Sequence, residues 1–203
     1  MDQSQQPSVL SDQDSDAFIE LHKEDPGLRK LRVAIGWQAP EKVNGYDLDM
    51  DVSLLILNRE NKVRSDEDFI FYNNLKSFEG SVVHNGDERK GFGEGDKEAI
   101  DIDLTGLPYD IEKMMFIISI HNANERFQSF KDLESGFIRI INFETHQEIG
   151  KFAMASAQSD AIAYALAILE RRDNEWVFER LQTPHEEGLY GIVRDHGVHV
   201  AEP

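Results

Sequence analysis

The stretch DLDMDVSLLILN, from Asp47 to Asn58, decides the fold because its side chains alternate in chemistry. Successive side chains of a strand point to opposite faces, so alternation of apolar and polar residues indicates a strand with one buried face. The apolar face comprises Leu48, Met50, Val52 and Leu54. The polar face comprises Asp47, Asp49, Asp51 and Ser53. We therefore predict a half-buried strand that begins with exposed carboxylates.

Similar strand patterns occur on both sides of this stretch. Apolar, β-branched and aromatic runs bounded by turn residues cover 17–23, 28–37, 68–74, 81–84, 99–104, 113–122, 136–145, 147–154 and 175–182. The runs 113–122 and 136–145 are long and apolar enough to be central strands. About eight to ten short strands with turn signals between them are typical of a two-sheet β-sandwich. We therefore predict a mainly β fold with this architecture.

The C-terminal part of the chain carries one or two short helices in our prediction. In segment 159–173, Ile162, Leu166 and Leu169 follow the i, i+4, i+7 spacing of an amphipathic helix, and Ser159 is a suitable N-cap. Segment 186–197 predicts a second short helix that ends at Gly197, a residue type common just after helix C-termini.

Composition limits the classes of function. The 203 residues carry a formal net charge of -18 and no cysteine. This charge argues against nucleic-acid binding, which needs a basic surface, and the lack of thiols excludes disulfides and thiolate metal sites. No apolar window is long enough to span a membrane, and the N-terminus lacks a secretory signal pattern, so we expect a cytoplasmic protein. Residues 1–16 are polar and acidic and predict a disordered tail, followed by a single domain over 17–203.

Segment 84–104, HNGDERKGFGEGDKEAIDIDL, concentrates carboxylates and glycines. Carboxylate, amide and backbone carbonyl oxygens are the ligands that Ca²⁺ prefers, and glycines let a backbone bend so that its carbonyls turn inward. The segment is not an EF-hand, because Phe92 occupies the glycine position of that loop. By composition alone, a calcium site and a solvated acidic hairpin both remain open.

The strings GYDLDMDVSLLILN, DFIFYNNLKSFEGSVVHNGDERKGFGEGDKEAIDIDL, ISIHNANERFQSFKDLESGFIRIIN and DNEWVFERL resemble, in order and spacing, the TerD-like family of tellurium-resistance and calcium-binding stress proteins. The resemblance covers about residues 17–197. It implies a β-sandwich that holds two neighbouring calcium ions. Matched position by position, the implied ligands are Asp47, Asp49, Asn73, Asp87, Gly91, Gly93, Glu94, Asp96 and Glu98.

Our leading hypothesis for the function is a non-enzymatic, calcium-binding stress-response protein related to tellurite resistance. Its bound cations would order a surface that recruits partner proteins of a stress-response complex. One alternative is a calcium-dependent module that binds membranes peripherally, with Phe92 as an apolar tip. The other is a metal-dependent phosphoesterase that uses paired ions as a two-metal clamp.

Several further residues receive a structural interpretation. We expect His84 and His121 to be hydrogen-bonded structural residues, because no neighbouring histidine or cysteine completes a zinc set. In ERFQSF, which matches a family motif, we predict that Phe127 and Phe130 are core residues. Arg126 and Gln128 are surface candidates of unassigned role.

Overall fold

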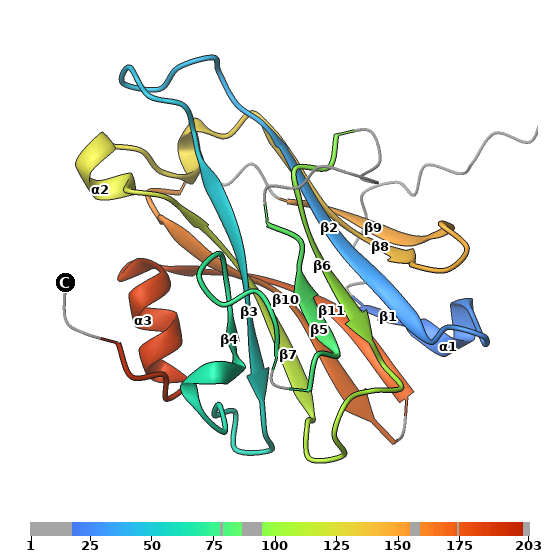
Figure 1. Ribbon diagram of the computed structural model, residues 1–203. Helices are drawn as coiled ribbons and strands as arrows, with labels where there is room; N and C mark the ends of the chain where they lie inside the picture. Colours follow the sequence, from blue (N-terminus) through green and yellow to red (C-terminus); the bar gives the residue numbers. More distant parts are fainter. Residues whose placement is uncertain (1–17, 78, 87–94, 155–158, 174, 201–203) are drawn as a thin grey trace, which may run out of the picture.

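The computed structural model describes residues 18–77, 79–86, 95–154, 159–173 and 175–200, and its strands form two antiparallel sheets (Figure 1). In spatial order, the six-stranded sheet consists of β1 (Phe18–Glu20), β11 (Glu175–His185), β10 (Ala163–Arg172), β7 (Lys113–Ile120), β3 (Met50–Leu57) and β4 (Phe69–Ile70). The five-stranded sheet consists of β5 (Val82–His84), β6 (Glu98–Asp103), β2 (Lys30–Gln38), β8 (Ser135–Asn142) and β9 (Glu148–Met154). The described helical elements are α1 (Leu21–Glu24), η1 (Asp66–Asp68), α2 (Ala123–Arg126), η2 (Phe130–Asp132) and α3 (Gly188–Asp195).

One hydrophobic core joins the two sheets. Ile35 of β2 and Ile138 of β8 belong to the same buried cluster as Phe116 of β7 and Phe178 of β11. The rings of Phe116 and Phe178 have centroids 5.5 Å apart. Two sheets that share a core in this way form a β-sandwich, so the predicted fold class is confirmed.

The alternation that predicted β3 is present at its start and disappears further along. Met50, Val52 and Leu54 face the shared core, as expected. Leu55 and Leu57 face the opposite side, where Ile192 and Val193 of α3 pack against them in a second buried cluster. The apolar run at the end of β3 is therefore buried on both faces, because α3 covers the outer face of the sheet there.

The helix predicted over 159–173 is wrong. Residues Ala163–Arg172 form β10, which pairs with β7 on one side and β11 on the other. A bulge between Ala165 and Ala167 interrupts the register with both neighbours. A central strand buried on both faces has a nearly continuous apolar sequence, which periodicity alone does not separate from a buried helix.

The other helix prediction is confirmed. The helix α3 ends at Asp195, and Gly197 follows with a φ of +90°, a conformation that suits glycine. At the N-terminal end, segment 17–23 is only partly a strand, because the chain turns from β1 into α1 at Leu21. Residues 1–16, predicted as a tail, lie outside the described residues. None of the helices in the described part of the chain is long and apolar enough to span a membrane.

Candidate metal centre

The structure describes five of the nine predicted ligands, and these fall into two groups. Asp47, Asp49 and Asn73 are exposed, whereas Asp96 and Glu98 are buried. The remaining four predicted ligands lie outside the described residues: Asp87, Gly91, Gly93 and Glu94. Phe92, the predicted membrane tip, lies outside them as well.

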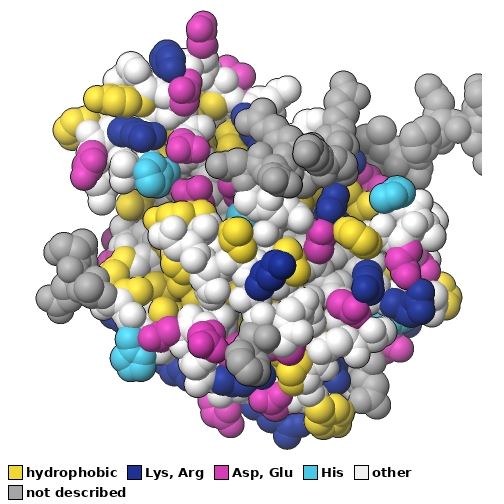
Figure 2. Space-filling model, viewed as in Figure 1, with side chains coloured by type: hydrophobic (Ala, Val, Ile, Leu, Met, Phe, Trp, Pro, Cys, Tyr) yellow, Lys and Arg dark blue, Asp and Glu magenta, His cyan; other side chains and the backbone are white. Residues whose placement is uncertain are grey.

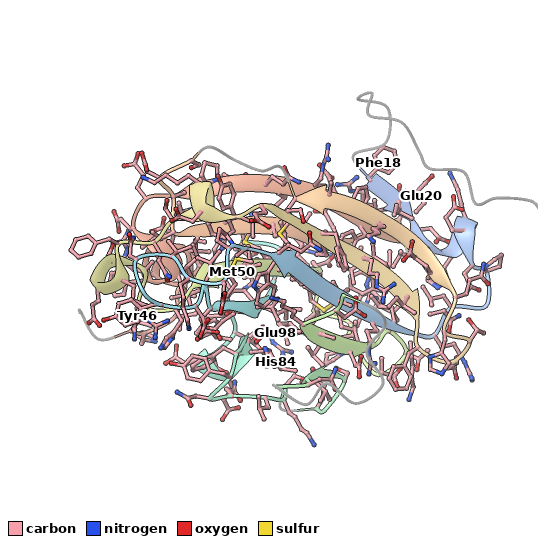
Figure 3. The ribbon with its side chains drawn as sticks, turned by 90° about the horizontal axis from the view of Figure 1, so that it is seen from above. Phe18, Glu20, Tyr46, Met50, His84 and Glu98 are labelled. Carbon is pink, nitrogen blue, oxygen red and sulfur yellow. The ribbon has the colours of Figure 1, made fainter. Side chains whose placement is uncertain are left out.

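Glu98 and His84 attach the five-stranded sheet to the backbone of β3 at Val52. The amide N–H of Val52 donates to Glu98 Oε2 at 2.5 Å, and its carbonyl lies 3.0 Å from His84 Nε2. Figure 3 shows Glu98 and His84 next to each other near Met50, where β3 begins. Strand β4 pairs with β3 only at Leu54 and Leu55, so these two side chains satisfy backbone groups of β3 beyond the end of β4.

The hydrogen bonds of His84 fix its tautomer. The amide N–H of Gly86 donates to His84 Nδ1 at 2.9 Å, so this nitrogen is unprotonated, and Nε2 therefore carries the proton donated to the Val52 carbonyl. The imidazole is buried and both of its nitrogens have backbone partners. This agrees with the structural role predicted for His84. His121 lies at the same end of β3, where its Nδ1 is 3.7 Å from a carboxylate oxygen of Asp51.

Asp96 forms a buried ion pair that the sequence did not reveal. Arg139 of β8 donates from Nε to Asp96 Oδ1 at 2.8 Å and from Nη2 to Asp96 Oδ2 at 2.6 Å. The Asp96 side chain is 0% exposed and that of Arg139 is 16% exposed. Hydrogen bonding to Asp96 is the main cause that raises the pKa of the Arg139 guanidinium, and Glu148 adds a second ion pair at 3.2 Å. The two-point geometry anchors the end of the acidic segment to the outer face of the five-stranded sheet.

Gly36 makes this anchor possible. A Cβ atom at Gly36 would lie 2.1 Å from the carbonyl oxygen of Gly95 and 2.5 Å from the ring of Phe137. Only glycine lets the backbone at Gly95 pass this close over β2. Just beyond it, the amide of Lys97 donates to the carbonyl of Ile35 at 2.8 Å and begins the pairing of β6 with β2.

The exposed predicted ligands have different surroundings. Asp47 accepts a hydrogen bond from Lys42 Nζ at 2.8 Å, and this contact lowers the pKa of the Asp47 carboxyl. The Asp49 carboxylate is exposed, and within the described chain it has no ion pair, while its backbone carbonyl accepts from the amide of His121 at 2.8 Å. Asn73 is exposed in the tight turn after β4. The neighbouring Asn74 serves the fold instead, because its side chain donates to the carbonyls of residues 67 and 69.

Within the part of the chain that the structure describes, no three acidic or histidine side chains converge on one point. Oxygen-bearing side chains of the expected types nevertheless lie near the start of β3: the exposed Asp49 precedes Met50, and the buried Glu98 binds the amide of Val52, while Asn73 is exposed in the turn after β4. The acidic segment leaves this end at Gly86, which is hydrogen-bonded to His84, and returns at Gly95 over β2. These donors fit a hard cation, and a complete ligand set requires the carboxylates of 87–94.

The interpretation of ERFQSF needs correction at two residues. Phe127 is 82% exposed and is not a core residue, whereas Phe130 is buried as predicted. Gln128, expected at the surface, is buried, and its Nε2 donates to the carbonyls of Val43 and Asp47 at 3.2 and 3.1 Å. The buried Gln128 amide is satisfied by backbone carbonyls of a segment about 80 positions earlier in the chain. The local sequence carries no signal for this contact.

Comparison with known proteins identifies the family. The TerD domain matches residues 14–196. General stress protein 16U of Bacillus subtilis (strain 168) is 38% identical over 182 residues, which cover 90% of this chain and 94% of that protein. Tellurium resistance protein TerD of an Alcaligenes species is 36% identical over 183 residues, which cover 90% and 95%. The crystal structure of a homologue of telluride resistance protein (TerD) from Streptomyces coelicolor A3(2) shares the fold with a TM-score of 0.64, at 16% identity, over 82% of this chain and 96% of that one. The resemblance predicted from the sequence is confirmed, and this chain belongs to the TerD family.

Proposed function

We propose that the protein is a cytoplasmic, non-enzymatic stress-response protein that binds two neighbouring calcium ions and recruits partner proteins. Its family includes tellurium-resistance and general stress proteins. The observation that carries the proposal is the position of Asp49, an exposed carboxylate with no ion pair in the described chain, at the same end of β3 as the buried Glu98. Both ends of the acidic segment are fastened at this end.

The donor types favour calcium over other metals. Asp49, Asn73 and Glu98 offer oxygen atoms, and His84 does not offer a ring nitrogen because backbone groups occupy both. Bound calcium would supply positive charge that offsets repulsion among these carboxylates and those at Asp87 and Glu94. Asp96 contributes chiefly by anchoring the end of the acidic segment, since Arg139 already neutralises its carboxylate.

The non-enzymatic part of the proposal rests on how nearby reactive groups are used. A phosphoesterase needs a general base or an arginine that contacts the phosphate. At the described end of β3, the candidates are His84, Arg139 and His121. His84 is held by Val52 and Gly86, and Arg139 by Asp96 and Glu148. His121 lies with its Nδ1 3.7 Å from a carboxylate oxygen of Asp51, so a phosphoesterase reaction here would have to use His121 as its general base.

Calorimetric titration of the metal-free protein with Ca²⁺ and with Mg²⁺ tests the proposal. We expect two calcium ions per chain, and a larger rise in melting temperature with Ca²⁺ than with equimolar Mg²⁺, because Mg²⁺ demands strict octahedral geometry and sheds its water reluctantly. Calcium at 100 times its dissociation constant should stabilise the fold by about 2.7 kcal/mol per site.

Asp49→Asn provides the residue-level test, because the exposed side chain can change without disturbing the core. We expect this variant to lose at least one calcium ion. The matched control is Asp160→Asn, which removes one charge from an 86% exposed aspartate paired with Lys131. If both variants bind calcium as the wild type does, or if Mg²⁺ stabilises as strongly as Ca²⁺, the acidic surface only attracts cations diffusely and the proposal is wrong.

A further inference from the structure

Two exposed aromatic side chains lie on hydrogen-bonded neighbouring segments at one end of the molecule. Tyr46, in the connection between β2 and β3, is 53% exposed, and Phe127, just after α2, is 82% exposed. We call them, with residues 43–47 of the connection and residues 123–128 of α2 and the turn after it, the aromatic tip. In Figure 1 this connection and α2 lie at the same end of the molecule, and in Figure 2 hydrophobic, acidic and basic side chains mingle there, at the upper left.

The aromatic tip is a built surface, because side-chain amides tie its two loops together. Asn44 Nδ2 donates to the carbonyl of Phe127 at 2.6 Å. From the other loop, Gln128 Nε2 donates to the carbonyls of Val43 and Asp47 at 3.2 and 3.1 Å. The Arg126 guanidinium lies 5.5 Å from the centroid of the Tyr46 ring. Because these bonds hold the backbone of both segments, less ordering entropy is lost when the two rings bind a partner.

Phe127 occupies its position against its own conformational preference. It is the C-cap of α2, with φ 52° and ψ 44°, in the left-handed region that glycine and asparagine tolerate better than an aromatic residue. Its ring is mostly exposed, so core packing does not compensate for the strain. A strained residue whose side chain the fold does not use indicates a role in binding.

The charge around the aromatic tip indicates which partner it accepts. Glu41, Asp49 and Glu125 are exposed and have no ion pair in the described chain. Of the cations nearby, Lys42 is paired with Asp47, and Arg126 lies over Tyr46. With a net charge of -18, a second copy of this chain or an anionic lipid surface would be repelled.

We propose that the aromatic tip docks an arginine-bearing basic segment of a partner protein. The guanidinium groups stack on the Phe127 and Tyr46 rings by cation–π contact, and the surrounding carboxylates attract the segment and pair with its remaining charges. This goes beyond calcium binding, because hydrogen bonds and not a metal ion join the two segments of the tip, although one of these bonds is accepted by the backbone carbonyl of the predicted ligand Asp47.

The test titrates the full chain with a labelled peptide of alternating arginine and glycine, in chelator and at physiological ionic strength. Working in chelator keeps the result independent of the calcium proposal. Phe127→Asn removes the ring and keeps the charge and the left-handed backbone. Tyr109→Asn is the control, since Tyr109 is a 75% exposed aromatic residue in another loop.

We expect Phe127→Asn to weaken peptide binding by about three- to tenfold, with an equal or higher melting temperature, and Tyr109→Asn to bind as the wild type does. The same peptide with glutamine in place of arginine should bind to none of the three proteins. The proposal is overturned if the wild type does not bind the arginine peptide, or if the two variants bind equally. It is also overturned if Phe127 is instead required for co-sedimentation with phosphatidylcholine vesicles or for self-association.

Discussion

The ion pair between Asp96 and Arg139 makes a prediction that separates two views of the acidic segment. If Asp96 were one of several repelling carboxylates, Asp96→Asn would leave the metal-free protein as stable as the wild type or more so. In the structure its side chain is fully buried and accepts two hydrogen bonds from Arg139. We therefore expect Asp96→Asn to destabilise the metal-free protein.

The expected loss in the free energy of unfolding depends on which partners Arg139 keeps in Asp96→Asn. Removing one partner of a buried ion pair costs about 3–5 kcal/mol, because the other charge stays buried without compensation. Arg139 keeps Glu148 at 3.2 Å, and asparagine still offers one carbonyl oxygen. Both reduce the penalty, so we expect the free energy of unfolding to fall by about 2–3 kcal/mol. For a chain of this size, that corresponds to a drop in melting temperature of about 5–10 °C.

Urea unfolding in chelator measures the effect. Asp160→Asn removes the same charge from an exposed pair and should change the free energy of unfolding by less than about 1 kcal/mol. Replacing both partners, Asp96→Asn with Arg139→Met, should recover part of the loss because no buried charge is left unpaired. If Asp96→Asn unfolds at the same urea concentration as Asp160→Asn, the ion pair does not hold the end of the acidic segment and our assignment is wrong.

Two other changes test the fold, one beside the site at Gly36 and one at the opposite end of the six-stranded sheet at Glu170. In urea unfolding, Gly36→Ala should lower the free energy of unfolding by about 3 kcal/mol, because its Cβ would meet the Gly95 carbonyl oxygen at 2.1 Å. In the control Gly27→Ala the nearest atom to the new Cβ is 3.6 Å away, so its free energy of unfolding should stay within about 0.5 kcal/mol of wild type. Equal effects of the two changes would contradict the close approach of Gly95 to β2. In β10, burial raises the pKa of Glu170, but hydrogen bonds from Lys113 and Arg172 outweigh burial and the pKa is lowered overall. A carboxyl group whose pKa is lowered by folding stabilises the protein at pH values above its ordinary pKa of about 4.3. This stabilisation is lost as the pH falls through the pKa of the folded state. Between pH 5 and pH 3, the melting temperature of the wild type should therefore fall more steeply than that of Glu170→Gln. Equal pH dependence of the two melting temperatures would refute this.

The strands that sequence predicts well are those with one exposed face. Met50, Val52 and Leu54 alternate with polar residues because the start of β3 borders solvent, so the period of two is visible. In β10 the pattern is lost, since Ala163 to Leu169 have neighbours on both edges and little exposure on either face. An apolar run of this kind has no period that distinguishes strand from helix.

The candidate site was predictable in its residue types but not in its contacts. The sequence shows that Asp96 and Glu98 belong to an acidic segment. It does not show that Asp96 pairs with a residue 43 positions away, or that Glu98 accepts from the amide of Val52, 46 positions away. The prediction that Phe127 is buried failed for a different reason. It rested on the hydrophobicity of the side chain, and nothing in the local sequence marks the left-handed backbone that directs the ring into water.

The two buried carboxylates fasten the end of the acidic segment to both sheets of the sandwich. Glu98 points inward and binds β3 of the opposite sheet, while Asp96, two residues earlier, binds β8 on the outer face of its own sheet. Because alternate residues of an extended chain would share a face, the different directions require the backbone to leave strand geometry between them, where Lys97 is not yet part of β6. The end of the segment is therefore fixed from both sides before any cation binds. If the site binds calcium as we propose, fixing the end of the segment lowers the ordering entropy lost on binding, and the affinity for calcium should depend on the contacts of Arg139 and Val52 as well as on the ligands themselves.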